Sequence, residues 1–127
     1  MIKDVTDLEI YKFALHLLPK LYDLLNKLPK SESFLVNQGK RSGSSISANI
    51  AEGFAKRIFN LEFKRYLLIS LASCDELISH LRTIALIQPG LTDQVNHLID
   101  EYKILAKRIN KTRSVWDFKG ISSSDLI

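Results

Sequence analysis

Residues 38–53 read QGKRSGSSISANIAEG, and the rest of the chain is organised around this stretch. Its three glycines and four serines ordinarily indicate a loop, because glycine loses much backbone entropy on ordering and serine competes for backbone hydrogen bonds. Their spacing is nevertheless helical. At 3.6 residues per turn, one narrow face of mostly small residues is formed by Leu35, Gly39, Ser42, Ile46, Ile50 and Gly53. A wholly polar line runs beside it, made of Gln38, Arg41, Ser45, Asn49 and Glu52.

The small face lets the backbone of a neighbouring helix approach closely, whereas the polar line needs partners for its hydrogen bonds. Those partners could lie within the same bundle, in another subunit or in solvent. The stretch therefore predicts an element for packing and assembly rather than a reaction centre.

Three further segments carry apolar residues at intervals of three and four. A first helix, capped by Asp7, is expected to bury Leu8, Tyr11, Leu15, Leu18, Tyr22 and Leu25. A long third helix is expected to bury Phe63, Leu67, Ser70, Cys74, Leu77, Leu81 and Ile84. A fourth, capped by Thr92, is expected to bury Val95, Leu98, Tyr102, Leu105 and Ile109. Pro19 predicts a bend in the first helix, and Ser31 or Ser33 can cap the second.

No segment shows the alternating pattern and turn residues of a β-hairpin, so no sheet is expected. Four amphipathic helices joined by short connections predict an all-α fold, an antiparallel up-down-up-down four-helix bundle. We expect one domain over residues 1–116, which is long enough to bury a core, and a disordered Ser-rich tail over residues 117–127.

The composition argues against several classes of protein. Cys74 is the only cysteine, so neither an intrachain disulfide nor a cysteine zinc site is expected. The N-terminal residues lack the apolar core of a signal peptide, and no apolar run is long enough to cross a membrane, so we expect a soluble cytoplasmic protein. A net charge of +4 permits an anionic partner, although an ordinary solvated surface gives the same value.

Motifs for catalysis or metal binding are weak. Gly39-Lys40 lacks the earlier glycine and the following Ser or Thr of a phosphate-binding loop. The three histidines fall on three different helices, without the Glu-x-x-His repeats of a bundle metal site. Cys74 precedes Asp75, whose charge raises a thiol pKa, which is the wrong direction for a nucleophile. We therefore predict no catalytic residue, no metal and no cofactor, and a protein that is not an enzyme.

The basic residues occur in pairs that are candidates for RNA binding: Lys40 and Arg41, Lys56 and Arg57, Lys64 and Arg65, and Lys107 and Arg108. On one chain these pairs do not share a single face, and a solvated surface is the simpler interpretation. In a ring of subunits, however, each weak patch recurs and its phosphate contacts add. Phe54, Phe59 and Tyr66 lie among these pairs and could stack on bases, with core packing as the alternative.

Four motifs resemble one known family: Gln38-x-x-Arg41, Ser45-Ile46-x-x-Asn49-Ile50-Ala51-Glu52-Gly53, Phe63-x-Arg65-Tyr66-Leu67 and Ala72-Ser73-x-x-Glu76-Leu77. They are similar to the signature of small four-helix bundle proteins encoded in intervening sequences of bacterial large-subunit ribosomal RNA genes. The resemblance covers residues 7–114 and implies a ring-shaped homopentamer. It also implies kinship with the accessory proteins of diversity-generating retroelements, which bind RNA and a reverse transcriptase.

No biochemical activity is established for the intervening-sequence branch of the family. Residues that carry the resemblance divide between the polar line and the small face, which favours a structural role over direct chemistry. The predicted structural or assembly motif consists of Gln38, Arg41, Ser45, Asn49, Glu52, Gly53 and Glu76. Our leading hypothesis is an oligomeric bundle that binds structured RNA or a ribonucleoprotein partner through the basic pairs. The alternative is an adaptor or assembly scaffold that binds only protein.

Overall fold

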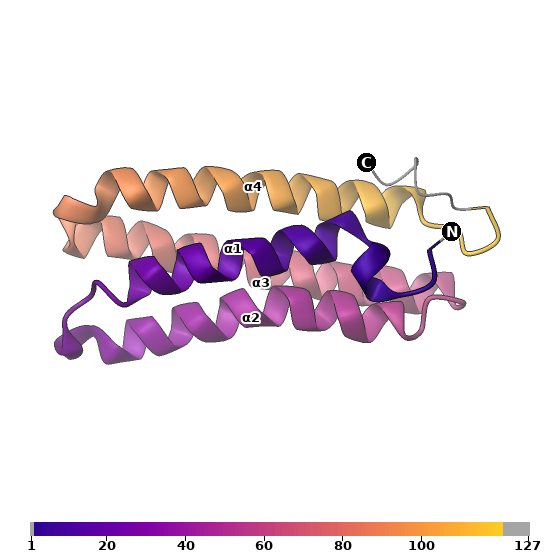
Figure 1. Cartoon of the computed structure of the whole chain (residues 1–127), viewed down its shortest axis with the longest axis horizontal. Helices are drawn as coiled ribbons and strands as arrows, with labels where there is room; N and C mark the ends of the chain where they lie inside the picture. Colours follow the sequence, from indigo (N-terminus) through magenta and orange to yellow (C-terminus); the bar gives the residue numbers. More distant parts are fainter. Residues whose placement is uncertain (1, 121–127) are drawn as a thin grey trace.

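The computed structural model describes residues 2–120, and in this part of the chain four long helices run antiparallel to one another (Figure 1). They are α1 (Glu9–Leu25), α2 (Ser33–Phe54), α3 (Asn60–Ile87) and α4 (Thr92–Val115). Short 3₁₀ turns precede three of them: η1 (Val5–Asp7), η2 (Lys30–Glu32) and η3 (Pro89–Leu91). Residues 2–120 contain no strand. The four long helices and their antiparallel packing confirm the expected up-down-up-down four-helix bundle. Within the same residues, no helix combines the length and apolar character needed to cross a membrane.

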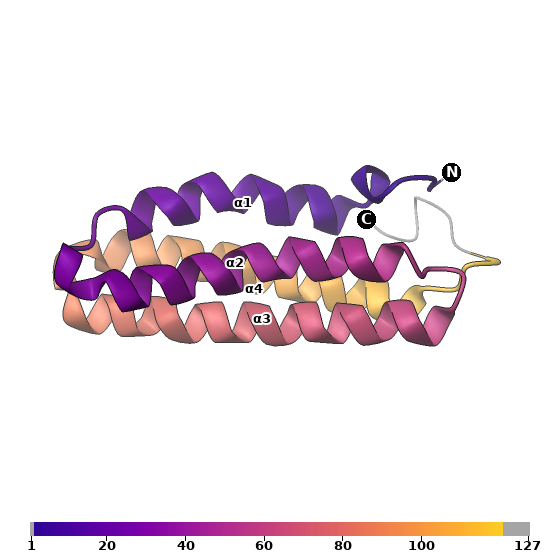
Figure 2. The same cartoon turned by 90° about the horizontal axis from the view of Figure 1, so that it is seen from below.

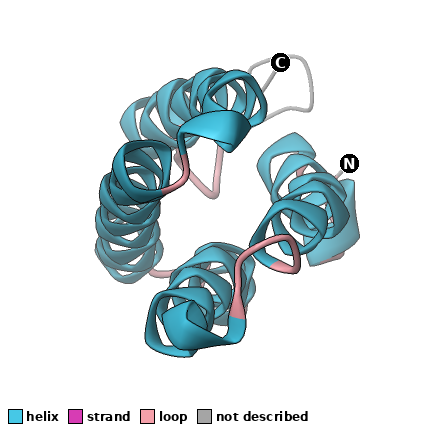
Figure 3. Cartoon of the chain, turned by 90° about the vertical axis from the view of Figure 1, so that its left-hand side faces the viewer, coloured by secondary structure: helices cyan, strands magenta, loops and turns pink. Residues whose placement is uncertain are grey.

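The view along the bundle axis shows the four helices around one shared interior (Figure 3). The predicted inner faces of α3 and α4 are confirmed, because every residue assigned to them is buried. The small face of α2 is confirmed as well, with only Leu35 partly exposed and the others buried at the contact with α1 and α3. Three of the four helices therefore face the core as their sequence spacing indicates.

The predicted inner face of α1 is wrong in its middle. Leu8 and Leu25, at the two ends of the predicted line, are buried as expected, but Leu15 is 41% exposed and the residues between are only partly buried. The buried line is instead made of Ile10, Ala14, Leu17, Leu21 and Leu24. Both lines repeat at intervals of three and four, so α1 has a broad apolar face and periodicity alone does not fix its centre.

The predicted helix caps are also wrong. The Asp7 carboxylate accepts hydrogen bonds from the amides of Lys3 and Asp4, at 2.9 and 3.0 Å, and so closes η1 rather than capping α1. The Thr92 hydroxyl donates to the Pro89 carbonyl at 2.8 Å. Neither Ser31 nor Ser33 caps α2. A 3₁₀ turn precedes three of the four helices. At these helix starts, backbone carbonyls accept hydrogen bonds where side-chain caps were expected. Helix α1 continues through Pro19 without a break, and the bend there stays a prediction.

The first described residues, the α2–α3 connection and the end of α4 meet at one end of the bundle (Figure 1). The buried Trp116 ring packs edge-on against Phe63, with ring centres 4.6 Å apart, and its Nε1 donates to the Arg57 carbonyl at 3.2 Å. The Phe118 amide donates to Asn60 Oδ1 at 3.0 Å. Residues 117–120 therefore form a turn against the α2–α3 connection, whereas the rest of the tail that we predicted to be disordered, residues 121–127, lies outside the described residues.

Candidate nucleic-acid and assembly surfaces

The polar line of α2 lies along the edge where α2 meets α3. Arg41 Nη2 donates to Gln38 Oε1 at 3.0 Å and to the two oxygens of Glu76, on α3, at 3.2 and 3.1 Å. One turn further on, the hydroxyls of Ser45 and Ser73 are 2.8 Å apart. Asn49 Nδ2 donates to the Ser45 carbonyl at 2.8 Å. The polar line is thus a seam between two helices of one chain.

This seam is too exposed to contribute much stability. The Arg41 and Glu76 side chains are 62% and 42% exposed. An exposed ion pair of this kind contributes about 0.2–1 kcal/mol, because water screens it and two long side chains must be ordered. Glu52 is exposed and makes no hydrogen bond or ion pair with the described residues. The seam therefore serves mainly to fix the register of α2 on α3.

Gly53 allows a close approach between α2 and α3. A Cβ at this position would lie 2.5 Å from Tyr66 Cβ and 3.0 Å from Phe63 Cδ1. Tyr66 Cβ is attached directly to the α3 backbone, so it cannot turn away as the end of a long side chain can. Gly53 is buried and has a negative φ, so its role is to make room rather than to turn the chain.

Each basic pair places at least one cation over an aromatic ring. Two of them share one ring, because Lys56 Nζ lies 4.9 Å and Arg65 Cζ 4.7 Å from the centre of Tyr66. The other three contacts are Lys40 over Tyr22, Arg57 over Phe54 and Arg108 over Phe13. Such contacts fix the position of a cation. Arg65 is also paired with a carboxylate, because its Nε lies 3.2 Å from Glu62 Oε2. Lys64 and Lys107 contact neither a ring nor a carboxylate among the described residues.

Arg57 has a structural role as well as a charge. It is half-buried, and its guanidinium donates to the carbonyls of Phe54 and Lys3 at 3.2 and 3.4 Å. Its own carbonyl accepts the hydrogen bond from Trp116. The residue therefore ties the N-terminal segment and the end of α4 to the α2–α3 connection, and replacing it would disturb the fold and the charge together.

The antiparallel topology brings three of the four basic pairs into one half of the bundle. We call residues 2–16, 48–69 and 105–120 the basic half; it contains the α2–α3 connection and lies on the right in Figure 2. It carries eleven lysines and arginines against six carboxylates, whereas residues 17–47 and 70–104, the neutral half, carry seven of each. Lys40 and Arg41 lie in the neutral half. The other six candidate cations lie in the basic half.

Comparison with known protein families gives a match over most of the chain. The model of the family described as 23S rRNA-intervening sequence protein matches residues 6–111. The chain belongs to this family. The matched residues run from η1 into the last turns of α4. They include the whole polar line and all eight candidate cations, whereas Trp116 of the core and both ends of the basic half lie outside the match. Kinship with retroelement accessory proteins stays a prediction. Among curated proteins, no match is found.

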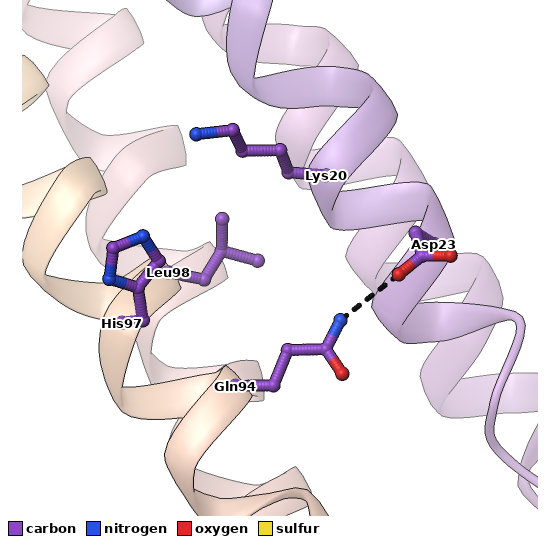
Figure 4. A pocket seen from close by; sticks show the side chains of 5 residues that line it. All are labelled: Lys20, Asp23, Gln94, His97 and Leu98. Carbon is purple, nitrogen blue, oxygen red and sulfur yellow. Dashed lines mark hydrogen bonds between the residues drawn. The ribbon is translucent and has the colours of Figure 1, made fainter.

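One pocket of about 220 Å³ lies between α1 and α4 in the neutral half of this 23S rRNA-intervening sequence protein (Figure 4). Its polar groups are already paired. Gln94 Nε2 donates to Asp23 Oδ2 at 3.2 Å, and Glu101 Oε1 lies 3.0 Å from Lys20 Nζ and 2.9 Å from His97 Nε2. Within residues 2–120 no group of three or more His, Cys, Asp or Glu side chains is placed to hold a metal. The pocket therefore offers no set of unpaired groups for a ligand.

Cys74 is buried in the core, and its Sγ lies 3.3 Å from the Tyr102 carbonyl as a donor. Burial, helped by the charge of Asp75, raises the pKa of the Cys74 thiol to about 12 from an ordinary value of 9.0. Burial also raises the pKa of the Tyr102 hydroxyl. Both groups hold their protons more tightly in the folded chain than in the unfolded one, so stability falls as the pH rises above about 9.

We expect Cys74 to resist thiol reagents in the folded protein. A maleimide at pH 8 should label it only when the core opens, because the reactive thiolate is both scarce and covered. The measurement is labelling followed by mass spectrometry, with the same protein in denaturant as the control that should label fully. Native labelling as fast as that of a small free thiol would contradict this assignment.

Proposed function

We propose that this member of the 23S rRNA-intervening sequence protein family is a non-enzymatic, oligomeric bundle that binds structured RNA through its basic half. The observation that carries the proposal is the uneven charge: an excess of five cations over carboxylates on the described residues of one half, against none on the other. RNA is a dense polyanion, and each phosphate that a lysine or arginine neutralises releases counterions, which drives binding.

The aromatic contacts strengthen this proposal. Lys56 lies in the α2–α3 connection and Arg65 on α3, yet the two share the Tyr66 ring. Cations that are already ordered lose less side-chain entropy when they meet a phosphate than freely moving ones do. The basic half is therefore better prepared for an extended anion than scattered surface lysines would be.

Assembly is supported by an uncovered stripe on α3. Leu61 and Leu86 are 83% and 81% exposed, and Leu68 lies between them at 53%. Ala72 and Ser79 are also exposed. Because each residue advances about 100° around a helix, these five residues lie within an arc of about 40° on one side of α3. A second copy of the chain is the occupant we propose, with the pentamer implied by the family resemblance as the assembled form. The basic halves would then recur around a ring and bind RNA together.

The experiment for RNA binding is a fluorescence anisotropy titration with a structured RNA at several salt concentrations. We expect the logarithm of the affinity to fall linearly with the logarithm of salt, with a slope set by the number of phosphates that the protein neutralises. Affinity no greater than that of an unrelated protein of equal charge, or affinity unchanged by salt, would contradict the proposal.

Assembly is tested by Leu68→Glu. A carboxylate in the middle of the α3 stripe should dissociate the oligomer without unfolding the chain, because Leu68 is exposed in the single bundle. Ile104→Glu is the matched control, since Ile104 is 45% exposed on α4 and outside the stripe. Light scattering gives the mass, which should be a multiple of 14.5 kDa for the parent protein. A parent protein that is strictly monomeric would overturn the assembly proposal.

The same stripe favours a second candidate, an adaptor that binds only protein. A partner protein, of which the family resemblance suggests a reverse transcriptase, would then cover Leu61, Leu68 and Leu86 in place of a second copy. The two functions are separated by the RNA titration, because an adaptor has no reason to bind RNA in a salt-dependent way.

A further inference from the structure

We infer that the basic half binds unpaired nucleotides of RNA and that a base stacks on the ring of Phe59. This inference rests on the proposed RNA binding and names the part of an RNA that the site accepts. It predicts a preference for loops over duplex, which the charge of the basic half alone does not require.

Phe59 is a large apolar side chain that the fold leaves uncovered. Of the three aromatic residues that lie among the basic pairs, Phe54 is buried edge-on against Phe63, with ring centres 6.1 Å apart, and Tyr66 carries two cations. Phe59 is 63% exposed and makes no ring contact with the described residues. Core packing therefore accounts for the aromatic ring at position 54, and contacts with two cations account for the ring at position 66. Neither role accounts for the exposed ring of Phe59.

The backbone of Phe59 is nevertheless firmly held. Its amide donates to the Lys56 carbonyl at 3.0 Å, and its carbonyl accepts from the amides of Glu62 and Phe63 at 3.0 and 3.1 Å. Phe59 is the N-cap residue that directly precedes α3, and no side chain among residues 2–120 caps that helix. The positive end of the α3 dipole thus lies beside the ring and adds to the attraction for a phosphate.

The surroundings of the ring fit a nucleotide in two respects. Lys56 precedes Phe59 by one turn, and Lys64 follows it on α3, so cations are available for the phosphates on both sides along the chain. A second exposed ring, that of Phe118, belongs to the same end of the bundle. The Phe118 amide donates a hydrogen bond to the side chain of Asn60, the residue after Phe59. Exposed rings among cations are the arrangement by which proteins hold single-stranded nucleic acid.

A base inside a duplex cannot use this arrangement, since both of its faces are covered by neighbouring base pairs. Unpaired bases in loops and bulges expose a face that can stack on an aromatic ring while their phosphates meet the cations. The charge and the rings of the basic half therefore point to the same ligand, an RNA loop.

The test compares two RNAs with equal numbers of phosphates, a hairpin with a loop of unpaired nucleotides and a blunt duplex. The parent protein should bind the hairpin more tightly. Phe59→Ala should lower the affinity for the hairpin by about 5- to 100-fold and leave the duplex affinity unchanged. Phe59→Trp should retain the hairpin preference, because a larger ring still stacks. Phe34→Ala is the matched control, since Phe34 is 76% exposed in the neutral half, and it should change neither affinity.

The outcomes separate this inference from the proposal beneath it. Salt-dependent binding of both RNAs with equal affinity, or equal losses for both RNAs in Phe59→Ala, would overturn the inference and leave RNA binding standing. Absence of salt-dependent binding to either RNA would overturn both. Loss of oligomer mass in Phe59→Ala, with hairpin affinity retained, would show that the ring meets a second copy of the chain and would also overturn the inference.

Discussion

Gly53→Ala is expected to lower the free energy of unfolding by about 2 kcal/mol. Alanine in a helix gains about 1 kcal/mol over glycine in intrinsic propensity. The new Cβ, however, would lie 2.5 Å from Tyr66 Cβ and 3.0 Å from Phe63 Cδ1. Forcing α2 and α3 apart at this point carries an overpacking cost at or beyond the upper end of the usual range of about 1–3 kcal/mol. The clash therefore outweighs the gain in propensity.

Gly53→Ala should also alter the protein surface that we propose binds RNA. Tyr66 carries Lys56 and Arg65 over its ring, so moving Tyr66 moves two cations of the basic half. Gly43 is a useful contrast, because a Cβ there would meet Leu21 Cδ2, the end of a side chain that can rotate. Gly43→Ala is therefore expected to be the milder of the two changes.

Urea unfolding followed by circular dichroism measures the effect of Gly53→Ala, with Gly90→Ala as the control. Nothing lies within 4 Å of a Cβ added at Gly90, and no described glycine has a positive φ. Gly90→Ala should leave stability unchanged or raise it by up to about 1 kcal/mol. A Gly53→Ala protein as stable as the parent would show that α2 and α3 do not approach as closely as described.

The second large effect is expected from removing charge in the basic half. The double change Lys64→Gln and Lys107→Gln should lower RNA affinity about tenfold or more and reduce the slope of its salt dependence by about one for each phosphate that is no longer neutralised. Neither lysine contacts a ring or a carboxylate among the described residues, so glutamine should leave the fold intact.

The matched control is Lys30→Gln with Arg82→Gln, two exposed cations of the neutral half. This control removes the same formal charge from the chain and should change RNA affinity only slightly. Equal losses of affinity in the two double variants would mean that RNA responds to the net charge alone and not to its position along the bundle.

The fold could be predicted from sequence wherever one face of a helix stands out. The α2 stretch is interpreted as a helix despite its glycines and serines, because their spacing follows the helical repeat and not the irregular pattern of a loop. Helix α4 has one clear apolar line, and on α3 the longest one, from Phe63 to Ile84, is the buried one. Helix α1 has two, and which of them faces inward depends on how α2 and α4 pack against it, which one segment of sequence does not contain. The predicted side-chain caps are wrong for a similar reason, because backbone groups of the 3₁₀ turns make the hydrogen bonds that were expected from side chains.

The candidate surfaces were predicted less completely. The basic pairs were evident, but their gathering into one half emerges only when antiparallel helices are aligned, so that Arg108 stands over Phe13 and Trp116 bonds to Arg57. The partners of the polar line, Ser73 and Glu76, could not be chosen among bundle, second subunit and solvent without the register of α2 on α3. The exposure of Phe59 likewise depends on packing, because its sequence neighbourhood resembles that of the buried Phe54.

RNA binding by the basic half is tested most directly by ultraviolet cross-linking of bound RNA to the parent protein, followed by peptide mapping with mass spectrometry. We expect cross-links in peptides from residues 2–16, 48–69 and 105–120, with Phe59 or its neighbours among the modified positions. Cross-links concentrated in residues 17–47 and 70–104, or no more numerous than those of an unrelated protein of equal charge, would contradict it.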